Sequence, residues 1–253
     1  MPLFDINCDM GEGFGNWRMC DDAAVMPLIS SANIACGFHA GDPNIMRSVV
    51  RMAKEHGVAV GAHPGLPDML GFGRRVMAVT PNDLYAYFIY QVGALQGFVA
   101  AEGMQLNHVK PHGALFHVLR NPELAEAAVD AVSAVAPGAS VYWPGPGLRE
   151  PFTERAAARN IRVCTEAYPD LDYGADGSLI VERHKKEVVP ELAYDRVHQI
   201  VSTKKLTTRD GDVLPMDVES VCLHGDSPNA LTIISAARKA IEASGYEVGC
   251  TTR

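Results

Sequence analysis

The chain has 253 residues, 47% of them hydrophobic, which is enough to bury the core of one large domain. Its formal net charge is −8 and no basic run is present, which argues against nucleic acid and anionic membranes as partners. No apolar run approaches the roughly 18 residues of a membrane span, and no signal peptide is visible. The six cysteines form no C-x-x-C pair, so we expect reduced thiols and a cytoplasmic location.

Strand-like and helix-like segments alternate along the chain. Apolar runs typical of buried strands begin at Leu3, Ala32, Val58, Leu106, Ser140, Arg162 and Val221. The helical segments between and after them are 21–29, 43–56, 80–102, 122–135, 150–159, 189–204 and 229–244. We predict a small hairpin at 207–215 and a long functional loop at 172–189.

Each connection between predicted strands is long enough for a parallel crossover. No linker divides the segments, so residues 1–253 are predicted to form a single domain. The expected fold class is α/β, a seven-stranded β/α barrel that is irregular or incompletely closed. An open doubly wound sheet is the alternative.

The segment 32–43 has the clearest organisation. An apolar run passes through a glycine-rich turn that carries His39 and then enters a helix at Asp42-Pro43. Aspartate is a good N-cap, and proline fits the first helical turn. The histidine therefore lies at the carboxyl end of a strand, where β/α barrels and open α/β sheets carry their chemistry.

Polar side chains follow the other predicted strands in the same way. The set is Asn7, Asp9, Glu12, His39, Asp42, His63, Asp68, Lys110, His112, Glu166, Asp170, His224 and Asp226. Four of the nine histidines belong to it. A single histidine in a turn is more often a hydrogen-bonded loop residue than a catalyst, and Asp42 fits a simple N-cap. The indication of an active site comes from the whole set.

Two chemistries suit this set. A divalent metal ion fits between His39, His63, His224 and a carboxylate after the first strand. Alternatively, carboxylates and imidazoles act without metal as general acid and base, with Lys110 stabilising negative charge. The catalytic candidates are Asp9, Glu12, His39, His63, Lys110, His112, Asp170 and His224.

Six segments carry a resemblance to a known family. They are Asp5-Ile-Asn-Cys-Asp-Met-Gly-Glu, Ser31-Ala-Asn-Ile-Ala-Cys-Gly-Phe-His-Ala-Gly-Asp, Gly61-Ala-His-Pro, His108-Val-Lys-Pro-His-Gly-Ala-Leu, Ala175-Asp-Gly-Ser-Leu and Val221-Cys-Leu-His-Gly-Asp. In this order and spacing they resemble the LamB/YcsF family. The resemblance implies a barrel similar to those of glycoside hydrolases and deacetylases.

The resemblance also implies a reaction, in which 5-oxo-L-proline, ATP and water give L-glutamate, ADP and phosphate. The chain would be the A subunit of a 5-oxoprolinase with partner subunits B and C. The motif residues Asn7, Asn33, Asp42 and Asp226 are then expected to bind the lactam substrate. The chain has no G-x-x-x-x-G-K-[ST] loop, so ATP with magnesium would bind by another device or at a site shared with a partner. A homo-oligomer is left open.

One position departs from the family pattern. Before Ala175, the family usually has Phe-Ala-Asp-Arg-x-Tyr, whereas this chain has Tyr168-Pro-Asp-Leu-Asp-Tyr, with Leu171 in place of the arginine. Leucine cannot bind a carboxylate, so another lactam or cyclic amide is a possible substrate. Two alternative functions are a metal-dependent hydrolase acting alone, such as a deacetylase, and a non-catalytic binding subunit.

Overall fold

The computed structural model describes residues 1–145, 150–180 and 186–252. Its strands are β1 (Leu3–Met10), β2 (Ser31–Ala35), β3 (Ala59–His63), β4 (His108–Val109), β5 (Ser140–Pro144), β6 (Val163–Ala167), β7 (Asp172–Tyr173), β8 (Leu179–Ile180), β9 (Lys205–Thr207), β10 (Val213–Pro215), β11 (Ser220–His224) and β12 (Glu247–Val248). Its helices are α1 (Asp22–Val25), η1 (Met26–Leu28), α2 (Pro43–His56), η2 (Met69–Gly71), α3 (Pro81–Ala101), α4 (Leu115–Val118), α5 (Pro122–Val135), α6 (Pro151–Ala158), α7 (Pro190–Thr203) and α8 (Ala230–Ala243).

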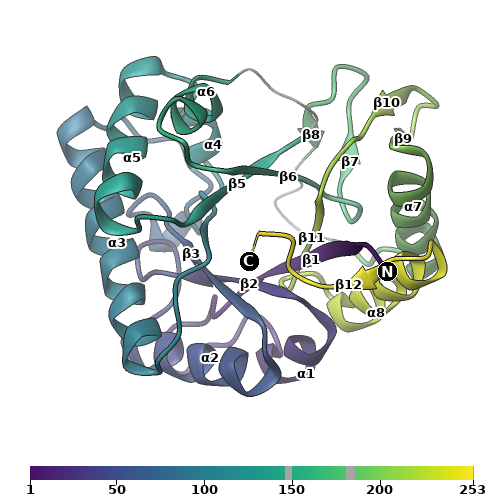
Figure 1. Ribbon diagram of the computed structural model, residues 1–253, viewed down its shortest axis with the longest axis horizontal. Coiled ribbons are helices and arrows are strands. Elements are labelled where there is room, and N and C mark those ends of the chain that lie inside the picture. The colour runs from purple at the N-terminus through teal and green to yellow at the C-terminus, as the bar shows by residue number, and fades with distance from the viewer. Residues whose placement is uncertain (146–149, 181–185, 253) are drawn as a thin grey trace.

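Seven parallel strands close into a barrel (Figure 1). The order is β1-β2-β3-β4-β5-β6-β11, and β11 pairs again with β1, where Asn7 lies opposite Cys222. The seven-stranded β/α barrel is therefore confirmed, and the open doubly wound sheet is wrong. Closure brings the residues after β1 and those after β11, more than 200 positions apart, to one rim.

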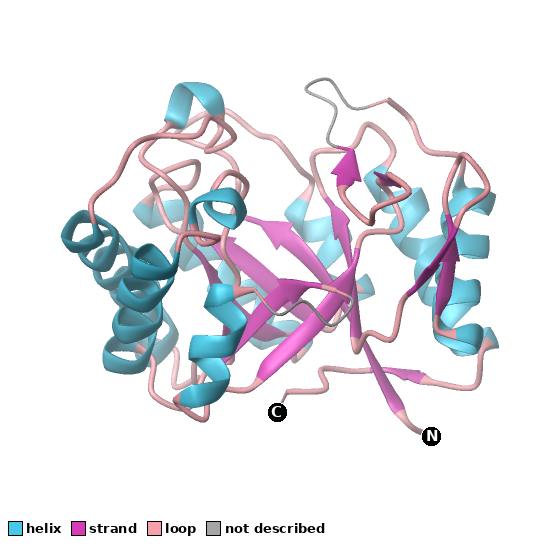
Figure 2. Ribbon diagram, turned by 90° about the horizontal axis from the view of Figure 1, so that it is seen from above, coloured by secondary structure: helices cyan, strands magenta, loops and turns pink. Residues whose placement is uncertain are grey.

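Helices surround the barrel on its outside (Figure 2). The long helix α3 packs against α5 and β3, and α7 packs against α8. By length and composition α3 would fit a membrane span. It buries Leu84, Phe88, Val92, Leu95 and Val99, as an outer helix of a barrel does.

The barrel interior is polar. Along β1 the buried side chains alternate between apolar and polar types, with Ile6 and Cys8 between Asp5, Asn7 and Asp9. Successive strand residues point to opposite faces, so the three polar side chains share one face of β1. The Asp5 carboxylate accepts hydrogen bonds from the hydroxyl groups of Ser30, Ser31, Tyr142 and Ser220, at 2.6 to 3.1 Å.

The C-terminal segment packs against the other end of the barrel. β12 pairs with the start of β1, at Leu3 and Phe4. Thr252 Oγ1 then accepts a hydrogen bond from Asn107 Nδ2 at 2.7 Å, just before β4. Figure 1 shows this end of the chain near the middle of the ring of strands.

Most predicted elements are present, with differences at short ones. The hairpin at 207–215 is confirmed as the antiparallel pair β9–β10. The predicted long loop contains the short antiparallel pair β7–β8, and its residues 181–185 lie outside the described residues. The four-residue helix α4 and the two-residue strand β12 were not predicted, because such short elements have little periodicity to detect.

Candidate active site

A network of amides and charged groups fills the barrel below its rim. Asn7 Nδ2 donates to Glu166 Oε2 at 2.7 Å, and Asn33 Nδ2 donates to Asn7 Oδ1 at 2.7 Å. Asn33 also donates to Asp9 Oδ1, while its own oxygen lies 2.7 Å from His108 Nε2. All five side chains are buried, so the network fixes the orientation of Asp9 and Glu166 before any ligand binds.

Lys110 is the charged centre of this network. Its Nζ lies 3.3 Å from both Asp9 Oδ1 and Glu166 Oε1, 3.1 Å from Asn7 Oδ1 and 2.8 Å from Cys222 Sγ. Burial alone would lower the pKa of the Lys110 ammonium group, but the neighbouring Asp9, Cys222 and Glu166 hold it well above its usual value. Lys110 is therefore a permanent buried cation.

Asp9 connects this network to the histidines. Its Oδ2 lies 3.4 Å from His63 Nε2 and 4.0 Å from His224 Nε2. Burial would raise the pKa of the Asp9 carboxyl, but His63 and Lys110 hold it well below its usual value. Asp9 is therefore ionised at neutral pH.

Three imidazoles meet beside Glu12 at the carboxyl end of the barrel. The His39 and His112 rings stack in parallel with centroids 3.6 Å apart, and His63 Nε2 lies 2.9 Å from His112 Nδ1. Glu12 Oε1 is 3.2 Å from His39 Nε2 and 3.6 Å from His112 Nδ1. Burial and the neighbouring histidines keep the pKa values of His39 and His112 well below the usual range, so both rings are neutral. These four residues have ligand atoms close enough to hold one metal ion.

His224 lies on the other side of Asp9 and is more exposed to solvent. Its Nδ1 is 2.9 Å from Asp170 Oδ2, which leaves Nε2 directed toward Asp9. The Tyr168 ring stacks on His224, and its hydroxyl donates to Glu166 Oε1 at 2.6 Å. His224 groups with Asp9 and Cys222 as a second potential ligand set, and it does not belong to the set of His39 and His63.

Comparison with known proteins identifies the family of this chain. The LamB/YcsF family pattern matches residues 4–253. The chain belongs to the LamB/YcsF family. It is 42% identical over 252 residues to a 5-oxoprolinase A subunit of Bacillus cytotoxicus, covering 98% of each chain. It is 44% identical over 250 residues to the lactam utilization protein lamB of Emericella nidulans, covering 96% of each. The crystal structure of a lactam utilization protein from Thermus thermophilus superposes with a TM-score of 0.88 at 42% identity, covering 98% of this chain and 99% of that one.

In this LamB/YcsF protein, the segment that departs from the family pattern packs inward. Leu171 is 9% exposed and belongs to the hydrophobic core. The guanidinium of Arg196, on α7, donates to the backbone oxygens of Pro169 and Leu171 at 3.1 and 3.0 Å. It therefore holds the segment that carries Asp170 without entering the site.

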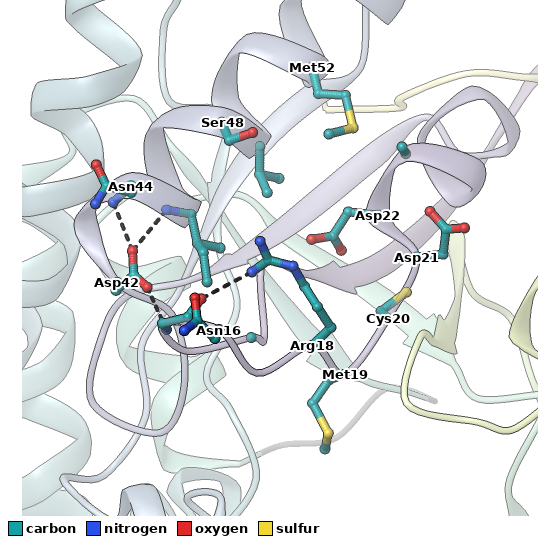
Figure 3. A pocket seen from close by; sticks show the side chains of 15 residues that line it. Asn16, Arg18, Met19, Cys20, Asp21, Asp22, Asp42, Asn44, Ser48 and Met52 are labelled. Atoms are coloured by element: carbon teal, nitrogen blue, oxygen red, sulfur yellow. Dashed lines mark hydrogen bonds between the residues drawn. The ribbon is translucent and has the colours of Figure 1, made fainter.

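Two of the expected substrate-binding residues contact other parts of the chain. Asp42 is the N-cap of α2, accepting from the backbone N–H groups of Asn44 and Ile45, and it lines an outer pocket with Arg18 and Asp22 (Figure 3). Asp226 pairs with Arg74 at 2.9 Å. Asp68 binds Arg75, so its role is to shape the loop after β3. Asn7 and Asn33 are inside the barrel with Asp9.

Three site residues escaped prediction for different reasons. From sequence, His108 and Cys222 stand out only as parts of the family segments, and Tyr168 only as part of the segment that departs from the family pattern. The spacing His108-x-Lys110-x-His112 is a usable signal, since residues two apart on an extended chain point to the same face. Cys222 has the same relation to His224 and Ser220.

Proposed function

We propose that this chain opens the ring of 5-oxo-L-proline to form L-glutamate, coupled to ATP hydrolysis, as the A subunit of a 5-oxoprolinase with partner subunits B and C. The relative from Bacillus cytotoxicus carries that name, and the relative from Emericella nidulans is named for lactam utilization. The observation that carries the proposal is that the partly exposed His224 lies beside the buried pair of Asp9 and Lys110 in a chain so similar to these relatives.

The arrangement suits proton transfer at a lactam. Ring opening needs a base that activates water and an acid that protonates the leaving nitrogen. His224 is the partly exposed imidazole, and Asp170 orients it through Nδ1, so Nε2 can exchange a proton with substrate. Asp9 stabilises the imidazolium that forms, and the fixed positive charge of Lys110 favours a developing oxyanion nearby.

ATP, with magnesium, makes ring opening favourable by supplying the free energy of phosphate release. Since the chain has no P-loop motif, we infer that its nucleotide site uses other residues or is completed by subunits B and C. We also place the reaction in the cytoplasm. All six cysteines are free, which fits a reducing compartment.

The test measures glutamate and ADP formed from 5-oxoproline by the chain alone, and by the chain with co-expressed subunits B and C. We expect both products only with the partners and ATP together. Binding of 5-oxoproline without turnover in the complete mixture would instead support a non-catalytic role.

A second candidate function rests on the cluster of Glu12, His39, His63 and His112. Such a cluster is compatible with a metal-dependent hydrolase that acts alone on a cyclic or acylated amide, such as a deacetylase. Amide cleavage by the isolated chain without ATP, abolished by a chelator, would favour this function over the first.

A further inference from the structure

The cluster of Glu12, His39, His63 and His112 is built from one strand end and three loops that follow successive strands at the barrel rim. Each side chain is at most 4% exposed, and their potential ligand atoms lie within 4.8 Å of one another. The residues lie at the ends of β1, β2, β3 and β4 or just after them, so the barrel itself sets their spacing.

Hydrogen bonds at the outer nitrogens decide which atoms face the cluster. His63 Nδ1 is 2.7 Å from the backbone oxygen of Lys110, and His112 Nε2 is 2.8 Å from that of Phe72. A carbonyl oxygen only accepts, so each of these nitrogens carries a proton. The other two nitrogens, His63 Nε2 and His112 Nδ1, face each other at 2.9 Å.

Two ring nitrogens at this distance are held together by a cation, either a shared proton or a metal ion. A shared proton would satisfy these two atoms alone. The Glu12 carboxylate and His39 Nε2, 3.2 Å apart, lie beside these two nitrogens and provide two more potential metal ligands. A histidine that binds a metal ion usually donates its other N–H to a carbonyl or carboxylate, as His63 and His112 do here.

Two glycines let the loop after β3 pack directly on the rings. A Cβ at Gly73 would lie 2.7 Å from His39 Cβ and 2.8 Å from His112 Cδ2. A Cβ at Gly65 would lie 2.5 Å from His39 Nδ1, which has no hydrogen-bond partner among the described residues. The His39 side chain is thus held in place by packing against Gly65, Gly73 and His112.

We propose that Glu12, His39, His63 and His112 bind one divalent transition-metal ion. Imidazole and carboxylate donors suit zinc and its neighbours in the first transition row. The set differs from the one expected from sequence in one histidine, His112 in place of His224, and Glu12 is the expected carboxylate after the first strand.

The test strips the full chain with a chelator and titrates it with Co²⁺, whose visible absorption reports ligand type and number. We expect one Co²⁺ per chain, displaced by Zn²⁺. His112→Ala and the isosteric Glu12→Gln should each weaken binding by about 100-fold or more. The exposed His117→Ala should leave Co²⁺ affinity unchanged. Circular dichroism of the metal-free variants verifies that each is folded.

A matched glycine pair tests the packing. Gly73 and Gly57 both have positive φ, +63° and +68°, but a Cβ at Gly57 would meet nothing within 4 Å. Gly73→Ala should therefore weaken Co²⁺ binding and Gly57→Ala should not. Absence of saturable Co²⁺ binding in the folded chain, or equal affinity in the His112→Ala variant, overturns the proposal. Because no lactam is present, failure of the 5-oxoproline assay does not affect this result.

Discussion

Lys110 supplies the buried positive charge that neutralises Asp9 and Glu166. Lys110→Met would leave these two carboxylates buried without their counter-charge, and breaking such a pair costs about 3–5 kcal/mol. We therefore expect the free energy of unfolding in urea to fall by that amount. If Lys110 only stabilised negative charge in the transition state, Lys110→Ala would lower turnover by about a hundredfold and leave folding intact. Because Lys110 is buried, we expect its replacement to lower the free energy of unfolding as well as the turnover.

The matched control is Lys54, which pairs with Glu102 at 3.6 Å but is 53% exposed. Lys54→Met should cost less than about 1 kcal/mol. The double variant Lys110→Met/Glu166→Gln should recover part of the lost stability, because one uncompensated carboxylate is neutralised. Equal losses in the single and double variants would show that charge pairing is not what Lys110 contributes.

His224 is the residue on which the proposed chemistry depends most directly. In the assembled complex, His224→Gln should lower kcat for 5-oxoproline by about 100-fold or more, since glutamine cannot transfer a proton. Asp170→Asn should lower kcat less, because His224 remains but is less well oriented. Steady-state kinetics measure both, with His117→Gln as the control. An unchanged kcat in folded His224→Gln would remove His224 from proton transfer.

The rim residues could be predicted one by one, but their grouping could not. Glycine-rich turns after apolar runs marked His39, His63, His112 and His224 as rim residues from sequence alone. Which of them meet depends on ring orientation, and that is set by the backbone oxygens of Lys110 and Phe72. No local pattern encodes these contacts, so the sequence alone does not show that His112, and not His224, lies beside His39 and His63.

α7 supports the site through Arg196, which is 8% exposed and spans the segment before β7. Its guanidinium bonds two backbone oxygens and Asp172 Oδ1, the last at 2.5 Å. Arg196→Met would leave these acceptors unpaired, so we expect unfolding free energy to fall by about 2–5 kcal/mol. By contrast, Leu171→Arg would bury a second cation beside Arg196 and should destabilise the chain rather than improve substrate binding.

Arg162 is a matched control for Arg196. It also bonds a backbone oxygen, that of Thr251, and a carboxylate, Glu219, but it is 46% exposed. Water can replace both bonds, so Arg162→Met should cost less than about 1 kcal/mol. Chemical denaturation of the two variants compares them. Similar losses at both positions would mean that burial does not determine the contribution of Arg196.

β3 approaches β4 so closely that Gly61 has room for no side chain. A Cβ there would overlap the His108 ring, which in turn bonds Asn33. Gly61→Ala should therefore lower unfolding free energy by about 1–3 kcal/mol through overpacking. Gly97 lies in α3 with nothing within 4 Å of a Cβ, and Gly97→Ala should raise stability by up to about 1 kcal/mol. Thermal unfolding distinguishes them, and a Gly61→Ala variant as stable as Gly97→Ala would contradict the packing.

The whole barrel was predictable in strand number but not in closure. Alternating strands and helices indicated seven parallel strands, whereas the pairing of β1 with β11 joins residues about 215 positions apart, such as Asp5 and Ser220. The polar interior had a visible signal in Asp5-x-Asn7-x-Asp9. That pattern contradicts the usual apolar filling of such barrels, so sequence reasoning placed the polar groups only at the rim.

A closed barrel with neutral histidines inside should lose stability in acid. Burial, and then the charge of Lys110, lower the pKa of His108 to about 3, whereas an unfolded histidine titrates near 6.5. Between these values the unfolded chain binds one more proton at this residue, so the free energy of unfolding falls as pH falls. His39 and His112, also with lowered pKa values, act in the same direction.

His108→Gln should therefore reduce the slope of the free energy of unfolding against pH, between about pH 6 and 4, by about 1.4 kcal/mol per pH unit. Urea unfolding at several pH values measures this slope, with exposed His117→Gln expected to leave it unchanged. If His108→Gln and the natural chain lose stability at the same rate, His108 is not the neutral buried imidazole that its contacts with Asn33 and Tyr142 indicate.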